Sequence, residues 1–549
     1  MKKELKFAIS RSAVDQHGGH WIEVVKSEKT VWISISQYAE SDTYGTRRFG
    51  RVGVALLTAA SKQEAKAALE GSEADEEIFA VAQPGFVIVG KGAEKRVIGY
   101  AYASGELIGC DKPSDPEVII GFEPHPDFGK GGDLNVFQAK MAPLIKKQAL
   151  PILMLTAAIA PILQQFTPPA LYVENMVIDL CGKGTRLKSA IAVAIAGPVW
   201  GSSDRKTGFL NNGNATPNKI ERTLPMYNNA LAGRDETTMM GDDASARGKA
   251  LGNLVHRISA GTVKERIGDD TSEVFRLIAI FSSNQGLWAI STEDTDVLEA
   301  LETRIVTIVI PERPTGAYDF LPEGHATTRS IQEQLYTIGL ANYGHIARLM
   351  IAKTLDALHA DPDGLTERIG SLMKRFMDAA GQARLDDRRV RCLKLFALCY
   401  ASGIIAKEWG VLDKDLFGAF REPLLRAWAM ANSRKAVDDR EGFFEYLRKH
   451  ADDVIVIDRS NRPETTDKTF SMAKAYILPL RDGQLLACFP AHRMPKRFPG
   501  FEPVWKRLRE KGQIVADSGL QSGQRIRLKD GVVCKDKVYA LRIDSWPLE

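Results

Sequence analysis

The nine residues GKGTRLKSA, Gly182 to Ala190, lie between two apolar runs, NMVIDL before them and IAVAIAG after them. Their spacing matches a phosphate-binding loop, G-x-x-x-x-G-K-S/T, with one exception: Leu187 stands where the pattern has its second glycine. Glycine suits that position because the backbone there approaches phosphate closely. The stretch therefore predicts a strand, a loop and a helix beginning at Lys-Ser, and a chance loop is the alternative.

The phosphate-binding pattern predicts a role for individual residues of the loop. Backbone N–H groups at Gly182, Gly184 and Thr185 would surround phosphate oxygens of ATP. Lys188 would reach the β- and γ-phosphates, and the Ser189 hydroxyl would bind Mg²⁺. These five residues are the predicted cofactor site.

An acidic pair, Asp235-Glu236, follows the lysine by 47 residues in NNALAGRDETT. In an ATPase, Asp235 would hold the Mg²⁺ water shell and Glu236 would polarise the attacking water. The preceding run NNALAG is a poor hydrophobic strand. A solvated Asp-Glu pair in a loop therefore stays the alternative.

Two more polar residues follow in an order that suits an ATPase core. The buried run FRLIAIFSSN ends at Asn284, whose amide would sense the γ-phosphate or position water, although an Asn that starts a turn is common. Arg304, in LETRIVTIVIPE, would act as an arginine finger supplied across a subunit interface, and a surface charge is the alternative.

Composition places the chain among ordinary globular proteins. Its 549 residues are 44% hydrophobic and 26% charged, and the net charge is only +4, so a polyanion partner would have to meet a local basic patch. Six scattered cysteines suit a reducing compartment, and the start of the chain lacks a signal-peptide pattern, so we expect a cytoplasmic protein. The apolar segment Ala149 to Leu163 is too short for a membrane span and predicts a buried helix.

Changes in periodicity predict four regions. Short β-branched runs indicate a β-rich domain, alternating strands and helices indicate an ATPase core, and long amphipathic repeats indicate a helical domain. A short helix followed by a hairpin around Asp530-Gly531 outlines a winged-helix-like domain. The expected boundaries are 1–130, 131–320, 321–450 and 451–549.

The last region is locally basic. From Arg493 to Glu549 it has thirteen Lys or Arg against seven Asp or Glu. The segment WKRLREK, with Lys506 and Arg507, mixes basic and aromatic residues, as in surfaces that contact nucleic acid. A solvated basic helix face is the alternative.

With these residues in place, the chain resembles the family labelled domain of unknown function 927, over roughly residues 90 to 450. These are ATPases of phages, plasmids and genomic islands, related to superfamily-three and MCM-like replicative helicases. Val199-Trp200-Gly201 at the end of the loop helix is typical of the family, as is the segment HRISAGTVKERIGDD. By analogy with the related helicases, that segment places Lys264 and Arg266 on DNA in a central pore.

The resemblance implies an α/β fold with a P-loop NTPase core of the AAA+ or superfamily-three kind. It also implies a hexameric ring that uses ATP and Mg²⁺ to move on single-stranded or forked DNA during replication of a mobile element. Thr185, Arg186 and Leu187 depart from the small residues usual in the family loop. A diverged ATPase-fold scaffold that binds DNA or a protein, or a phage-defence ATPase, is therefore the alternative.

Overall fold

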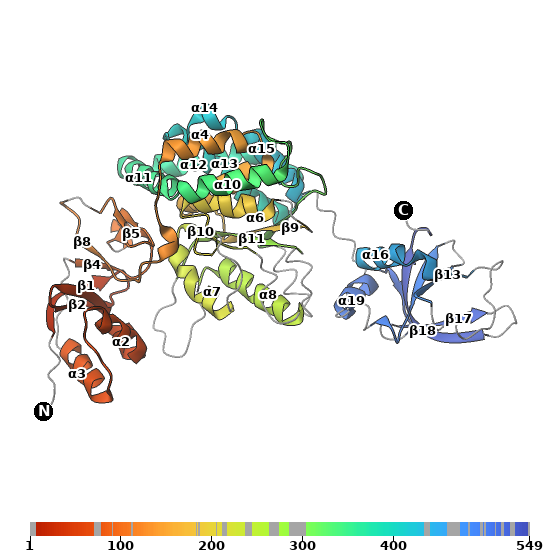
Figure 1. The fold of residues 1–549 in the computed structure, drawn as a ribbon, viewed down its shortest axis with the longest axis horizontal. Coiled ribbons are helices and arrows are strands. Elements are labelled where there is room, and N and C mark those ends of the chain that lie inside the picture. The colour runs from red at the N-terminus through yellow and green to blue at the C-terminus, as the bar shows by residue number, and fades with distance from the viewer. Residues whose placement is uncertain are drawn as a thin grey trace. The chain divides into compact units, whose positions relative to one another are not determined.

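The structure is a computed structural model of the 549-residue chain (Figure 1). It describes residues 7–70, 78–90, 92–110, 113–182, 184, 187–204, 206–210, 217–235, 244–262, 274–284, 303–432, 440–457, 473–480, 484–494, 498, 501–510, 512–517, 521–527 and 533–546. The chain divides into two compact units, and we describe each by itself. The first contains Met1–Ala289 and Asp296–Asn432, and the second contains Ser433–Glu549.

Two small sheets begin the first unit, as the β-branched runs predict. One has the strand order β3-β2-β1-β4-β8, and the other is the antiparallel set β5-β6-β7. Helices α1, α2 and α3 pack on the first sheet through a shared apolar cluster. The elements are β1 (Ala8–Asp15), β2 (His20–Lys26), β3 (Lys29–Ser34), α1 (Ile35–Glu40), α2 (Asp42–Arg51), α3 (Ala59–Glu70), β4 (Ile78–Val81), β5 (Gly85–Val89), β6 (Arg96–Ala101), β7 (Leu107–Ile108) and β8 (Glu117–Ile120).

A parallel four-stranded sheet follows, in the order β10-β11-β9-β12. The apolar runs predicted β9, β11 and β12, and the weak run NNALAG also forms a strand, β10, in which every residue except Arg234 is buried. Figure 1 shows α7 and α8 on the face of this sheet opposite α6. The elements are β9 (Met176–Cys181), α6 (Lys188–Ile191), α7 (Pro217–Thr223), β10 (Ala230–Arg234), α8 (Ala244–Ala260), β11 (Leu277–Ser283) and β12 (Ile305–Val309).

The helix α5 (Ala149–Gln164) is the centre of the core. All of its 16 residues are buried, which confirms the predicted buried helix. One side packs on β10 and β11, and the other packs against α13 and α15. Among the described helices, none combines the length and apolar character that crossing a bilayer requires.

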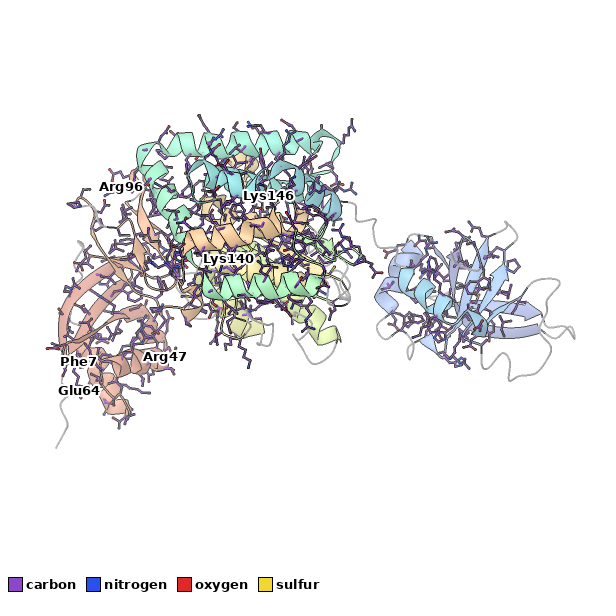
Figure 2. All side chains as sticks on the ribbon, turned by 45° about the horizontal axis from the view of Figure 1, so that its top comes forward. Phe7, Arg47, Glu64, Arg96, Lys140 and Lys146 are labelled. Atoms are coloured by element: carbon purple, nitrogen blue, oxygen red, sulfur yellow. The ribbon has the colours of Figure 1, made fainter. Side chains whose placement is uncertain are left out.

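Long helices form the rest of the first unit, as their periodicity predicts. Lys140, exposed on α4, and Lys146, at its end, are labelled in Figure 2. The helices are α4 (Leu134–Ile145), α10 (Thr328–Ala341), α11 (His345–Ala360), α12 (Pro362–Ala379), α13 (Asp387–Glu408), α14 (Lys414–Phe417) and α15 (Arg421–Asn432). The chain is therefore a mixed α/β protein.

The second unit is built on one sheet, in the order β13-β14-β15-β18-β16, with β17 paired to β18. The antiparallel β17–β18 pair confirms the predicted hairpin, although the turn at Asp530-Gly531 lies outside the described residues. Trp505 of α19 is fully buried with Phe443 of α16 on one face of the sheet. The elements are α16 (Glu441–Lys449), β13 (Val454–Val456), β14 (Ala475–Pro479), β15 (Leu485–Pro490), α19 (Glu502–Glu510), β16 (Ile514–Val515), β17 (Ser522–Arg527) and β18 (Val533–Ile543).

Arg348 of α11 joins the small antiparallel sheet to the helical layer of the first unit. Its side chain is only 11% exposed and pairs with Glu106 at 2.6 Å. The guanidinium also donates to the carbonyls of Gly344 at 2.7 Å and Phe128 at 3.1 Å. It lies 4.0 Å from the Tyr102 ring centroid. One side chain therefore satisfies acceptors from several separate segments.

Replacing Arg348 by Ala is expected to destabilise the first unit by about 3 kcal/mol, because it leaves buried acceptors unpaired. The measurement is urea unfolding followed by tryptophan fluorescence and circular dichroism. Arg329→Ala is the matched control, since that side chain is 87% exposed and its one ion pair among the described residues is with Glu333 on its own helix. Equal midpoints for the two variants would contradict the proposed role of Arg348.

Candidate functional site

Strands β9, β10 and β11 are parallel, so their carboxyl ends meet at one edge of the sheet. The register pairs Arg234 with Phe281 and Ser283 with Cys181. The next residues along the three strands are Asp235, Asn284 and Gly182. The predicted loop, carboxylate and amide therefore leave the sheet at the same edge, which is where ligands bind in open α/β sheets.

Lys188 is the first residue of α6, as predicted, and the residue is 5% exposed. The ammonium Nζ donates to the carbonyl oxygens of Gly182 and Gly184, the second at 3.3 Å. It also donates to Asn284 Oδ1 at 3.2 Å. The structure thus brings together two candidate residues that lie 96 positions apart.

Asp235 follows β10 and is partly buried, and its Oδ1 accepts a hydrogen bond from the Ser282 hydroxyl. Ser189 is the second residue of α6 and is also partly buried. In the described parts of the chain, no three His, Cys, Asp or Glu side chains gather as a metal cage. One carboxylate and one hydroxyl are, however, the kind of donor set that Mg²⁺ uses when phosphate oxygens and water complete its shell. In donor chemistry, Ser189 and Asp235 would suit Mg²⁺ bound together with ATP.

Leu187 has a left-handed backbone, with φ +64° and ψ +11°. This conformation costs a non-glycine residue roughly 1–2 kcal/mol, which explains why the loop pattern has glycine there. The Leu187 side chain is 5% exposed, so its burial offsets the backbone cost. Gly182 and Gly184 also have positive φ values, +145° and +79°.

The remaining candidates lie apart from this edge or outside the described residues. Arg304 precedes β12, and its carbonyl accepts a hydrogen bond from Val177 near the start of β9, at the opposite edge of the sheet. Lys506 is exposed on α19. The side chain of Arg507 lies outside the description, as do these four residues: Thr185, Glu236, Lys264 and Arg266.

One charged group beside the site has no counterpart in the sequence prediction. Arg234 ends β10 next to Asp235, with its guanidinium 5.9 Å from the Tyr227 ring centroid. Burial raises the pKa of Asp127 to about 6, and the Arg234 charge opposes that rise. Burial also lowers the pKa of His125, whose Nδ1 lies 3.6 Å from Asp127 Oδ2. An arginine at the end of a buried strand is the sequence signal that could have indicated this cluster.

Comparison with known proteins supports the fold. Residues 112–273 match the model of the family described as "Domain of unknown function (DUF927)", which confirms the resemblance to that family over this range. The structure resembles one described as "SCCmec type IV Cch - active helicase", with a TM-score of 0.55 and 15% identity over 98% of this chain and 93% of that chain. At this identity, the likeness is one of fold.

A second similar structure is described as the A form apo structure of the NrS-1 C-terminal region. Its TM-score is 0.26 at 12% identity, over 73% of this chain and 92% of that chain. No curated protein matches the sequence.

At most positions alanine gives a more stable protein than glycine, but the left-handed backbone at Leu187 predicts the opposite order for two variants. L187G is expected to be more stable than L187A by about 1 kcal/mol, because both lose the buried side chain but only glycine relieves the strain. The control is Ala190 in α6, where A190G should lower stability by about 1 kcal/mol. Denaturant unfolding measures both. L187A equal to or more stable than L187G would show that the loop backbone is not left-handed.

The raised pKa of the partly buried Asp127 predicts that the free energy of unfolding depends on pH. Its folded pKa of about 6 lies above the usual value of 3.8, so the folded state holds the proton more tightly and loses stability as pH rises between these values. D127N should therefore be more stable than the wild type at pH 8, by roughly 2–3 kcal/mol, and equal to it below pH 4.

Asp204 supplies a control of opposite sign for D127N. Backbone N–H donors from Thr207 and Lys206 lower its pKa. D204N should therefore reduce stability at neutral pH, by an amount that falls away as pH is lowered. Thermal unfolding across the pH range measures both variants, and a D127N curve parallel to the wild type would contradict the assignment.

Proposed function

We propose that the chain is an ATP-dependent DNA helicase or translocase of a mobile genetic element, with a P-loop NTPase core that works in an oligomeric ring. The observation that carries this proposal is the contact between Lys188 Nζ and Asn284 Oδ1, at 3.2 Å, at the sheet edge where Asp235 also emerges. A cation, an amide and a carboxylate at one edge of a parallel sheet suit a nucleoside triphosphate. The family resemblance and the helicase-like fold support the same class.

Each group at the edge has a role in this proposal. Lys188 holds the β- and γ-phosphates, and the backbone N–H groups of the loop from Gly182 to Thr185 surround them. Ser189 and Asp235 hold Mg²⁺. Asn284, with Glu236, positions the attacking water. Bound ATP supplies the phosphoanhydride bond whose cleavage drives movement.

Arg304 supports the ring part of the proposal. It lies beyond the amino end of β9, and the loop lies beyond the carboxyl end. A strand of this length separates them by about 17 Å, so Arg304 cannot reach the phosphates bound by its own chain. It would act as an arginine finger on the neighbouring subunit of a hexamer.

DNA contact in this proposal involves two regions. Lys264 and Arg266 would face the pore of the ring. In the second unit, α19 is followed by β16 and by the β17–β18 pair, an order shared with winged-helix domains. Lys506 and Arg507 on α19 would contact phosphates of the DNA backbone.

A scaffold without turnover is the second candidate, and Leu187 is the observation that favours it. A side chain replaces glycine where the loop must close around phosphate, and Lys188 bonds to carbonyls of its own loop. Such a protein would use the same fold to bind DNA or a protein partner, in replication or in phage defence.

Lys188→Ala is expected to abolish DNA-stimulated ATP hydrolysis, because no other described cation lies within hydrogen-bond distance of Asn284 at this edge. Phosphate release with and without single-stranded DNA measures this. Lys140→Ala, an exposed lysine on α4, is the control and should leave the rate unchanged.

Nucleotide binding, measured separately, distinguishes the two candidates. Wild-type protein that binds ATP without turnover would support the scaffold. A K188A variant that hydrolyses ATP at the wild-type rate would contradict the role of the loop altogether.

A further inference from the structure

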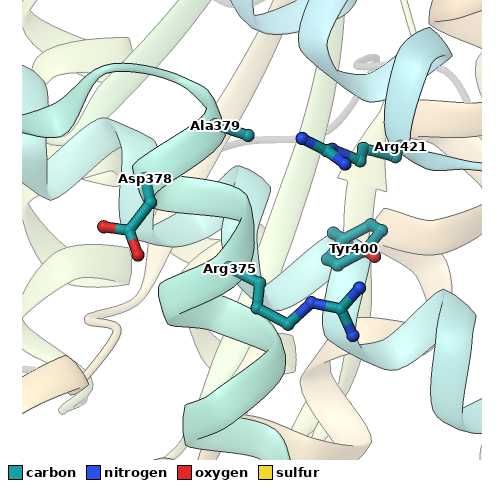
Figure 3. A pocket seen from close by; sticks show the side chains of 5 residues that line it. All are labelled: Arg375, Asp378, Ala379, Tyr400 and Arg421. Carbon is teal, nitrogen blue, oxygen red and sulfur yellow. The ribbon is translucent and has the colours of Figure 1, made fainter.

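A pocket in the helical part of the first unit lies away from the loop edge. It is a cavity of about 260 Å³, open to solvent on one side, between α12, α13 and the start of α15. Figure 3 shows the side chains that line it: Arg375, Asp378, Ala379, Tyr400 and Arg421. No role proposed above involves these residues.

Two arginines face this pocket from different helices. In Figure 3 the guanidinium groups of Arg375 and Arg421 lie on either side of the Tyr400 ring. Both residues are exposed, and within the described part of the chain neither forms an ion pair. Two positive charges therefore meet at one cavity without forming an ion pair to any described residue.

Asp378 lines the pocket but does not neutralise it. It follows Arg375 by three residues, a spacing at which helical ion pairs form. Its carboxylate points away from Tyr400 in Figure 3, and its Oδ1 accepts a hydrogen bond from Gln382 Nε2 at 2.6 Å. Arg375 thus lines the cavity without pairing with Asp378.

The floor of the pocket is fixed in place. Tyr400 is 5% exposed, and its ring stacks on that of the fully buried Phe376, with centroids 5.3 Å apart and planes at 29°. Arg421 is the first residue of α15, so the positive end of that helix adds to the local potential. Guanidinium groups that line a cavity with a rigid base are suited to a phosphate group, because each can donate parallel hydrogen bonds to its oxygens.

We propose that the Arg375–Arg421 pocket binds a phosphodiester group of single-stranded DNA, an inference that rests on the proposed function. The cavity is smaller than the roughly 300–1,000 Å³ of sites that enclose a whole small ligand. It therefore suits one group of a longer chain, and its open side lets the strand continue in both directions.

The test uses the full chain and a fluorescein-labelled oligothymidylate, titrated at several salt concentrations. R375Q/R421Q should lower affinity about tenfold and reduce the slope of log affinity against log salt by about 1. The matched control is R329Q/R389Q, which removes two exposed arginines that pair with acids on or beside their own helices. Circular dichroism verifies that both variants are folded.

Each outcome decides the inference. Wild-type affinity and salt slope in R375Q/R421Q, with clear binding by the wild type, would overturn it and leave the proposed function intact. A parallel titration with pyrophosphate separates the two sources of phosphate. If R375Q/R421Q loses pyrophosphate binding but keeps oligonucleotide binding, the pocket belongs to a free phosphate compound, and the DNA assignment is overturned. No oligonucleotide binding by the wild type would overturn both proposals.

ATP hydrolysis without DNA provides the separate readout for the loop. It depends on Lys188 and not on this pocket, so R375Q/R421Q should keep the wild-type basal rate while losing DNA affinity. A basal rate that falls together with the affinity would show that the substitutions act through the folded core, and would overturn a direct role in DNA binding.

Discussion

The parallel hydrogen bonding of β9 to β11 on one side and to β12 on the other is the constraint on which the candidate site depends. The buried Asn175 secures the amino end of β9. Its amide accepts from Leu277 N–H at 2.9 Å and donates to the Phe275 carbonyl at 3.0 Å. A shift of one residue would break these bonds and exchange the side chains between the two faces of the sheet, both of which are packed. The position of the loop relative to Asn284 follows from this register.

The hydrophobic pattern of the sequence predicted those strands and helices whose own residues are strongly apolar. The apolar runs before and after Gly182 predicted β9 and the helix that begins at Lys188. The apolar segment Ala149 to Leu163 predicted α5. Strand β10 was less visible, because Ala230–Arg234 contains few large apolar residues. Its burial comes from β11 beside it and from α5, which packs against it. Both partners lie far from β10 in the sequence, so the residues around β10 do not indicate its burial.

The same distinction separates the parts of the site. Parallel strands imply a common edge, so the sequence could place Lys188, Asp235 and Asn284 near one another once the strands were recognised. The cluster of Asp127 with Arg234 and Tyr227 joins three segments whose positions depend on packing across the whole unit. The arginine pocket likewise depends on how α12, α13 and α15 cross, which periodicity within each helix does not specify.

Leu187 departs from the loop pattern in residue type, and its backbone is nevertheless left-handed. Glycine adopts a left-handed backbone without steric cost, and Leu187 adopts such a backbone here, at φ +64°. Burying its side chain contributes about 2 kcal/mol, which is enough to offset the strain. The side chain is 5% exposed whereas Gly184 is exposed, so the added bulk points into the protein and not toward the open side of the loop. The substitution therefore keeps the left-handed backbone at this one position, and what it removes is the flexibility that glycine provides.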